Sequence, residues 1–380
     1  MATLNAINRF YFFLFGAIII LFVFSNAHFK MDFSALWLFT LGLSFAIFSP
    51  ETTSSLLGVL KPFSYAIAYI IGLSIYGKLK DKPQYKGFYV LTVTIVAGST
   101  VHFILNFITN RASSDRNIVD FWSQTSLAAT GQAAIALLTV ALAIGCLFSD
   151  FSLKYKLISL IAIITVALYN LLLAGRTLFI MMILLIALAF LFRLYSSSKK
   201  RFQFIVITAF ILFLSIIIWN SNLFNVRNIF ENSNFYQRFF GQFSGEITSD
   251  SRGNRKLFYL QNLTQYPFGG VNMRDYVGYA HYIILDTYDE ASIFAALAVI
   301  LYLIASLSRL ISVIRNKSLP FSLRQITICL YIACYIEFCI EPILQGMPWL
   351  FVSFCIIDGY IKQILNAPKA KTASQRKMIV

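Results

Sequence analysis

Long runs of apolar residues, separated by short polar loops, fill most of the chain. A helix needs about 20 apolar residues to cross the hydrocarbon core of a bilayer. The runs are continuous and do not alternate residue by residue, so they indicate helices rather than the strands of a membrane barrel. We therefore predict an all-α, polytopic membrane bundle of about eleven spans. The predicted spans are 10–27, 33–48, 56–77, 87–109, 127–148, 157–173, 177–195, 202–219, 291–313, 325–344 and 347–365.

One long polar segment, between Asn220 and Tyr282, interrupts this pattern. It carries five arginines, one lysine, four acidic residues and many aromatics. A membrane protein that keeps one arginine-rich loop on one side of the bilayer is expected to carry out its chemistry there. The predicted parts of the chain are N-terminal spans at 1–219, a large external loop at 220–282, C-terminal spans at 283–365 and a tail at 366–380.

The distribution of charge predicts the orientation of the bundle. The net charge is +15, yet only 12% of the residues are charged, against about 25% in soluble domains. The basic residues gather in short loops, as the positive-inside rule predicts for the cytoplasmic side, and this argues against a nucleic-acid partner. The C-terminus is then cytoplasmic and the 220–282 loop external. The loop cations are Lys78, Lys80, Lys82, Lys86, Lys154, Lys156, Arg193, Lys199, Lys200, Arg201, Arg309, Arg315, Lys317 and Arg324.

Ionisable residues in or beside the spans are candidate functional groups, because a charge at the centre of a membrane helix costs about 2.5–3.5 kcal/mol. Arg176 stands at the junction of two spans. It either snorkels to lipid headgroups or is a fixed cation at a helix N-terminus, which also favours anions. Glu337 and Glu341 share one helix face. They either pair with arginines or supply a catalytic carboxylate, whereas His102 is expected to be a hydrogen-bonded packing residue.

The external loop contains cations suited to a diphosphate. Arg252 and Arg255 lie close together in the sequence, and Arg274 follows. Guanidinium groups form bidentate hydrogen bonds to phosphate oxygens, so an arginine cluster beside a membrane is a candidate pyrophosphate clamp. His281, near the end of the loop, is a candidate for hydrogen bonding or proton transfer.

The same loop contains a predicted turn and several aromatics. Pro267 followed by Gly269 and Gly270 predicts a turn that lets the backbone come close to a ligand. Tyr259 and Tyr266 either stack on sugar rings or rest on lipid headgroups, as interfacial aromatics commonly do.

Neither metal binding nor thiol chemistry is expected. The five cysteines all lie in predicted spans without a Cys-x-x-Cys spacing, where a free cysteine is a small buried hydrophobe. Asp286 and Glu290 would share a face of a helix. They either complement the dipole at a helix start or hold a divalent cation, but no Asp-x-Asp motif supports the second reading.

Together these features resemble the O-antigen polymerase and O-antigen ligase superfamily of bacterial envelope proteins. The layout is similar, with about a dozen helices and one large periplasmic loop in the second half. Tyr282 stands where an asparagine is usual, and this looser motif favours the polymerase branch over the ligase branch. The short motifs that resemble the family are Gly175-Arg176 before an apolar span, Arg252 or Arg255 upstream of Pro267-Phe268-Gly269-Gly270, and His281-Tyr282-Ile283-Ile284-Leu285 followed by Glu290.

The resemblance implies a metal-independent, cofactor-free membrane glycosyltransferase of GT-C-like fold in the bacterial inner membrane, with a periplasmic active site. Its donor is a growing glycan on undecaprenyl pyrophosphate, and its acceptor is the next lipid-linked unit. Lipopolysaccharide biosynthesis is the expected context, with a chain-length regulator as a possible partner. The implied catalytic residues are Arg176, Arg255, His281, Glu290 and Glu337, and the implied substrate-binding residues are Arg252, Arg274, Tyr259, Tyr266, Gly269 and Gly270.

Two alternatives stay open. In an O-antigen ligase the same chemistry transfers the glycan to the lipid A core. A lipid-linked oligosaccharide flippase or other transporter belongs to a different class, which is expected to show repeated halves and broken helices meeting at the midplane. The sequence shows no internal repeat, and its polar residues gather towards one face.

Overall fold

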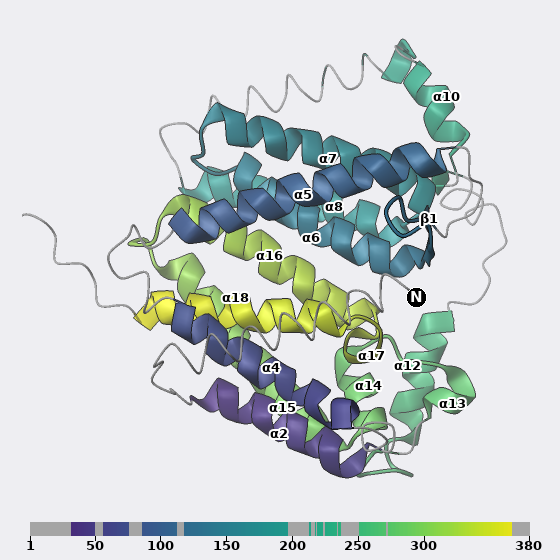
Figure 1. The fold of residues 1–380 in the computed structure, drawn as a ribbon, viewed down its shortest axis with the longest axis vertical. Coiled ribbons are helices and arrows are strands. Elements are labelled where there is room, and N and C mark those ends of the chain that lie inside the picture. Colours follow the sequence, from purple (N-terminus) through teal and green to yellow (C-terminus); the bar gives the residue numbers. More distant parts are fainter. Residues whose placement is uncertain are drawn as a thin grey trace, which may run out of the picture.

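The structure is a computed structural model and describes residues 32–49, 56–75, 86–111, 118–196, 213, 217, 219–222, 225–233, 235–236, 251–270 and 273–366. These residues are almost entirely helical (Figure 1). The long helices are α2 (Phe33–Phe48), α4 (Leu56–Ile75), α5 (Lys86–Asn110), α6 (Ala129–Leu147), α7 (Leu153–Leu173), α8 (Arg176–Ser196), α15 (Ile293–Arg315), α16 (Phe321–Ile340) and α18 (Pro348–Asn366). The short helices are α10 (Val226–Glu231), α12 (Ser251–Asn262), α13 (Arg274–Val277), α14 (Ile283–Glu290) and α17 (Ile343–Gly346), and a small antiparallel hairpin joins β1 (Ile118–Val119) to β2 (Ser126–Leu127).

The all-α, multi-pass membrane class predicted from the apolar runs is confirmed. In the described part, seven helices are long and apolar enough to cross a membrane, and α2 is a shorter apolar helix. The predicted span at 10–27 and all but a few residues of the span at 202–219 lie outside the described residues. The total of about eleven spans therefore stays a prediction.

The ends of the long helices gather at two opposite ends of the bundle. At one end, Arg193 Nη1 donates to Asp150 Oδ1 over 2.7 Å, and the Asp150 N–H donates to Ser322 Oγ over 3.2 Å. At the same end, Lys362 Nζ lies 3.4 Å from Asp32 Oδ2. We call this the basic end, on the left in Figure 1, and we call the opposite end, where α12 and α13 lie, the loop end.

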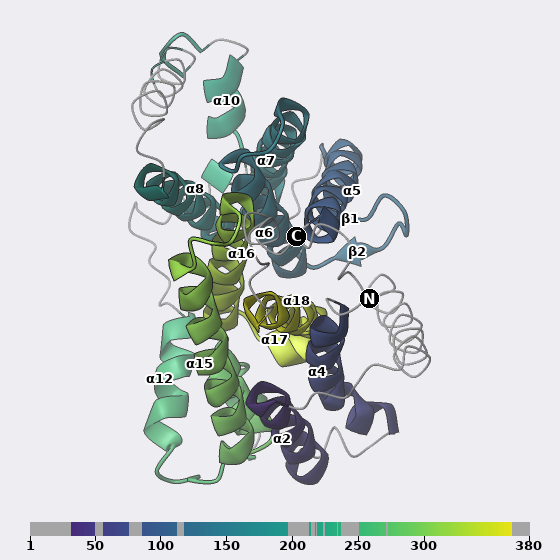
Figure 2. The ribbon, with the colours of Figure 1, turned by 90° about the vertical axis from the view of Figure 1, so that its left-hand side faces the viewer.

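Helices α6 and α16 form the centre of the bundle. In the most apolar 18-residue stretch of each helix, 67% of α6 and 72% of α16 are buried inside the protein. The corresponding share is only 28% for α5 and for α8. Figure 2 shows α6 and α16 between the group of α5, α7 and α8 and the group of α2, α4, α15 and α18. The backbones approach closely where Gly145 faces Ile326, since a Cβ atom at Gly145 would lie 2.7 Å from Ile326 Cα.

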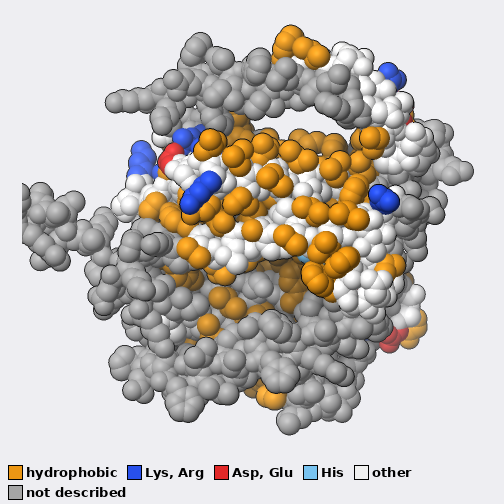
Figure 3. All heavy atoms as spheres, turned by 45° about the horizontal axis from the view of Figure 1, so that its top comes forward, with side chains coloured by type: hydrophobic (Ala, Val, Ile, Leu, Met, Phe, Trp, Pro, Cys, Tyr) orange, Lys and Arg blue, Asp and Glu red, His pale blue; other side chains and the backbone are white. Residues whose placement is uncertain are grey.

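The outer helices present apolar side chains to their surroundings. Ile161 on α7 and Ile180 on α8 are more than half exposed, as is Ile304 on α15. Figure 3 shows such side chains spread over one face of the described part. Exposed apolar surface of this extent is typical of contact with lipid.

Two glycines set the distance between α4 and α18. A Cβ atom at Gly72 would lie 2.1 Å from the Ile356 carbonyl oxygen, and one at Gly359 would lie 2.2 Å from the Tyr69 carbonyl oxygen. Small residues allow this close backbone approach, which is a common basis of helix association in membranes. Nothing in the apolar runs themselves indicated this pair.

We expect Gly359→Ala to destabilise the protein by about 1–3 kcal/mol, because its new methyl group meets backbone that must shift. Gly98→Ala is the matched control, since nothing lies within 4 Å of a Cβ atom at Gly98 on α5. Thermal unfolding of the purified protein in detergent compares the two. Equal melting temperatures for the two variants would contradict the packing described.

Candidate functional site at the loop end

His281 joins the loop to α14 and has an uncommon backbone conformation. Its φ angle is 56°, in the left-handed region that residues other than glycine adopt infrequently. Asp286, in the first turn of α14, accepts hydrogen bonds from the N–H groups of Ala280 (2.7 Å) and Tyr282 (3.0 Å). One carboxylate therefore holds the backbone on both sides of His281.

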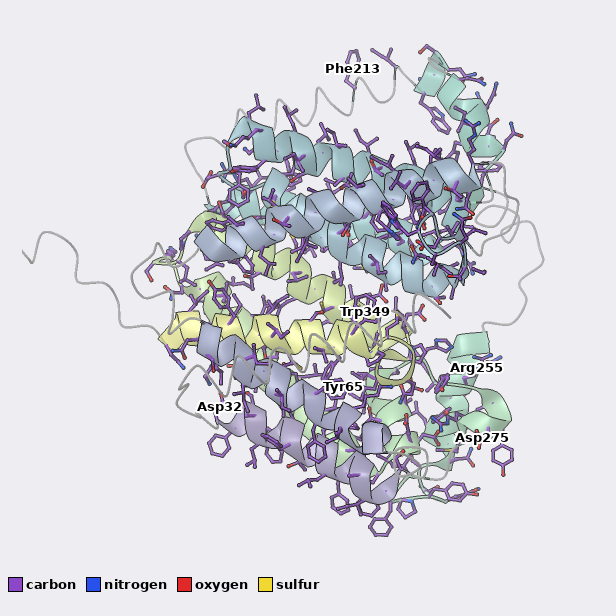
Figure 4. All side chains as sticks on the ribbon, in the orientation of Figure 1. Asp32, Tyr65, Phe213, Arg255, Asp275 and Trp349 are labelled. Carbon is purple, nitrogen blue, oxygen red and sulfur yellow. The ribbon has the colours of Figure 1, made fainter. Side chains whose placement is uncertain are left out.

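The His281 imidazole lies between a cation and an acid from two other helices. Arg255 of α12 places Nη1 3.3 Å from His281 Nε2, and Glu341, which caps the end of α16, places Oε2 3.6 Å from His281 Nδ1. A guanidinium can only donate, so the hydrogen bond requires Nε2 to accept. In a neutral imidazole the proton is then on Nδ1, which faces Glu341. Arg255 is labelled at the loop end in Figure 4.

The Arg255–His281–Glu341 cluster is partly accessible. The side chains of His281 and Glu341 are 16% and 11% exposed, so both are shielded yet reachable. Gly278 makes room for the guanidinium, because a Cβ atom there would lie 3.2 Å from Arg255 Nη1. The φ angle of 77° at Gly278 also favours glycine.

Helix α12 is held against the rest of the loop end by two contacts. Lys256 Nζ donates to the carbonyl oxygen of Cys339 in the last turn of α16, over 2.8 Å. The Tyr259 hydroxyl donates to the Gly278 carbonyl oxygen over 3.1 Å and lies 3.4 Å from Asp289 Oδ2. Burial raises the pKa of Tyr259, and the nearby acids raise it further. The Tyr259 ring has no exposed surface, so in this structure it anchors α12.

A second polar group lies deeper and joins α13, α14 and α17. The Arg274 side chain is only 7% exposed, and its Nη1 lies 3.5 Å from Glu290 Oε2. Gln345 Nε2 donates to the same Glu290 oxygen over 2.5 Å. Asp289 accepts from the N–H groups of Met273 (2.5 Å) and Arg274 (3.2 Å), and burial raises its pKa. The predicted site residues Arg274 and Glu290 are thus paired with each other.

The predicted turn after Pro267 is present and packs on protein backbone. The φ angles of Gly269 and Gly270 are 73° and 72°. A Cβ atom at Gly269 would lie 2.2 Å from the Tyr288 carbonyl oxygen, and the Gly270 N–H donates to that oxygen over 3.0 Å. The close approach that requires glycine is therefore to α14. Tyr266, before the turn, is 42% exposed.

Arg176 is the first residue of α8, as predicted from the junction of two spans. The turn before it depends on Asn170, whose Nδ2 donates to the Gly175 carbonyl oxygen and whose Oδ1 accepts from the Gly175 N–H, both over 3.1 Å. A Cβ atom at Gly175 would lie 2.7 Å from Asn170 Oδ1. This close contact accounts for glycine before Arg176.

The packing of α8 on α16 places Arg176 at the loop end. The two helices run antiparallel, and Gln325 Nε2 donates to the Ala189 carbonyl oxygen over 3.2 Å. Arg176 precedes Ala189 by about 20 Å of helix, so it lies at the end of α8 away from the basic end. Glu337, in the last turn of α16, is buried. The end of α16 contacts the α12 segment through Lys256. Arg252 lies in the first turn of α12, and its side chain is outside the described residues.

His102 is a hydrogen-bonded packing residue, as predicted. Its Nε2 lies 3.2 Å from Gln132 Oε1 and 3.1 Å from Asn106 Nδ2. The Tyr169 hydroxyl donates to the same Gln132 oxygen over 3.0 Å. This network joins α5, α6 and α7.

The prediction that Arg309 belongs to a basic loop is wrong. Arg309 lies inside α15, 6% exposed, and forms an ion pair with the fully buried Asp358 of α18. Its Nε donates to Asp358 Oδ1 over 2.7 Å, and its Nη2 donates to Oδ2. The signal in the sequence was a lone acid, Asp358, inside a predicted span.

Comparison with known protein families and with curated proteins finds no match for this chain. The helices and their apolar surfaces define the class as a multi-pass α-helical membrane protein.

Proposed function

We propose that this protein is a polymerase of lipid-linked oligosaccharide units. It transfers a growing glycan from undecaprenyl pyrophosphate to a sugar hydroxyl of the next lipid-linked unit, at the periplasmic face of the bacterial inner membrane. One observation carries the proposal. A cation, an imidazole and a carboxylate from α12, the start of α14 and the end of α16 converge in the Arg255–His281–Glu341 cluster, at the ends of the membrane helices.

These three groups fit the chemistry of glycosyl transfer. The acceptor hydroxyl oxygen attacks the anomeric carbon, and the bond from that carbon to the pyrophosphate oxygen breaks with its electron pair on the leaving group. Arg255 stabilises the negative charge that develops on the leaving pyrophosphate, with Arg176 as a second cation. His281 accepts the hydroxyl proton at Nε2. Glu341, on the other side of the ring, stabilises the imidazolium that forms, as an acid does for the histidine of a hydrolase triad.

Arg255 has two competing partners in this mechanism. Without substrate, its Nη1 donates to His281 Nε2, the atom that must accept the proton. A pyrophosphate dianion is a stronger acceptor for a guanidinium than an imidazole is. Binding of the donor therefore draws Arg255 away from the ring and frees Nε2 for the acceptor hydroxyl.

The charge distribution supports the orientation that this function needs. The cations Arg193, Arg315 and Lys362 lie at or beside the basic end, where helices α8, α15 and α18 end. By the positive-inside rule this end faces the cytoplasm. The loop end, with the Arg255–His281–Glu341 cluster, then faces the periplasm, where lipid-linked units are polymerised.

Deletion of the gene, with surface polysaccharide separated on a gel, tests the proposal. We expect the ladder of long chains to disappear and a product with a single repeat unit to remain. Plasmid-borne wild-type protein restores the ladder and serves as the control. Full-length polymer that stays on its lipid carrier would instead identify a ligase, and lipid-linked units trapped at the cytoplasmic face would identify a flippase. Either of these results would overturn the proposal.

A further inference from the structure

We infer that Asp286 is a positioning residue for His281, because its carboxylate fixes the left-handed backbone that points the imidazole at Arg255 and Glu341. The chemical meaning of this role rests on the proposed function. The structural role can be measured without any activity.

The Asp286 carboxylate accepts hydrogen bonds from the residues on either side of His281. Oδ1 accepts from the Ala280 N–H over 2.7 Å, and Oδ2 accepts from the Tyr282 N–H over 3.0 Å. These are the N–H groups immediately before and after His281. The Asp286 N–H in turn donates to the Tyr282 carbonyl oxygen over 2.9 Å. Asp286 therefore fixes the backbone on both sides of His281, where the chain enters α14.

The conformation at His281 needs such support. A residue other than glycine is strained when its backbone φ angle is 56°, as at His281. Such left-handed conformations persist only where the surrounding structure holds them. Asp286 is 2% exposed, so water does not compete for its oxygens. Burial raises the pKa of Asp286 to about 6, and the two backbone hydrogen bonds oppose that rise by favouring the charged form.

The amide variant Asp286→Asn removes half of the support without changing the shape of the side chain. Asparagine keeps one oxygen acceptor but replaces the other with an NH₂ donor. One of the two N–H groups beside His281 then faces a donor. We expect the backbone to relax and the imidazole to lose its fixed orientation between Arg255 and Glu341.

Asp289 provides a matched control on the same helix. It is a buried acid that also accepts two backbone N–H groups, from Met273 and Arg274. Neither of these groups flanks His281. Asp289→Asn therefore imposes a similar loss of an acceptor in a buried site while leaving the His281 backbone held.

The test is nitrogen NMR of the His281 ring in the full-length protein in nanodiscs. The chain has three histidines, so His28→Gln with His102→Gln leaves His281 as the single reporter. In this background we expect one neutral tautomer with its proton on Nδ1. Asp286→Asn is expected to give an average of both tautomers, and Asp289→Asn to keep the original signal. An unchanged signal in Asp286→Asn, or the same change in both variants, would overturn the inference.

A double-mutant cycle on melting temperature distinguishes support of the His281 backbone from a general loss of stability. Glycine adopts positive φ angles without strain, so His281→Gly removes the need for support at this residue. We expect Asp286→Asn to lower the melting temperature clearly less in the His281→Gly background than in the wild type. Equal shifts in both backgrounds would contradict the positioning role.

Polymer formation then tests the link to function. A small displacement of a catalytic group reduces a rate by about 100-fold, which is the loss expected for Asp286→Asn. If His281→Ala still polymerises at the wild-type rate, the proposed base is wrong. The NMR result would nevertheless stand on its own, so the two failures are distinguishable.

Discussion

Asp358→Asn is expected to lower the free energy of unfolding by about 3–5 kcal/mol, because it leaves the Arg309 guanidinium buried without its counter-charge. The change keeps the shape of the side chain and removes only the negative charge. Titration of the purified protein with a denaturing detergent measures the loss.

The size of this effect follows from the surroundings of the pair. Asp358 has no exposed surface. It accepts a hydrogen bond from the Tyr331 hydroxyl over 2.8 Å and from Ser306 Oγ over 3.2 Å, in addition to those from Arg309. Arg309 Nη1 donates to Ser34 Oγ over 2.8 Å. The network therefore joins α2, α15, α16 and α18, and its disruption affects four helices together.

Two controls sharpen the test. The double variant Arg309→Met with Asp358→Leu removes both charges, and it should recover most of the stability, since apolar pairs of similar volume often replace buried ion pairs without loss. Asp150→Asn breaks an ion pair with Arg193 at the basic end, where the Asp150 side chain is 56% exposed. Such pairs contribute about 0–1 kcal/mol. An Asp358→Asn variant as stable as Asp150→Asn would contradict the structural role of the network.

The helices were predictable because their apolar runs are long. Their predicted boundaries are wrong where polar residues form part of a helix. Helix α16 begins at Phe321, four residues before its predicted start, because its partly polar first turn packs inside the bundle: Ser322 and Leu323 are buried. It ends before Glu341 and Pro342, although the predicted span continued to residue 344. Proline removes a backbone donor and disfavours helix at the residue before it.

The residue types of the site were predictable, but their partners were not. Arginine, histidine and acidic residues suit the chemistry of a diphosphate, and this selected Arg255 and His281. The acid beside His281 is Glu341, sixty residues further along the chain, and its distance from His281 depends on how α14 and α16 pack. Arg274 and Glu290 were both selected, but their mutual pairing is likewise set by tertiary structure. Spacing in the sequence carries little information about such contacts.

Arg255→Ala is expected to reduce the rate of polymer formation by about 10²–10³-fold, the loss typical when one group that stabilises developing negative charge is removed. The rate is measured with purified lipid-linked units and protein in nanodiscs, with products resolved by chain length. We expect the fold to be retained, because Lys256 and Tyr259 continue to hold α12 against α16 and α14.

Two further variants assign the effect to geometry at this position. Arg255→Lys keeps the charge but loses the planar fork that pairs two N–H groups with phosphate oxygens, so its rate should lie between those of the wild type and Arg255→Ala. Arg227 is an arginine of the same loop whose side chain is 56% exposed and paired with Glu231 one turn away. Arg227→Ala removes the same charge from the loop and should leave the rate unchanged. An equal loss in both alanine variants would mean that the loop acts through its overall charge, and the Arg255–His281–Glu341 cluster would then not be the place where the glycan is transferred.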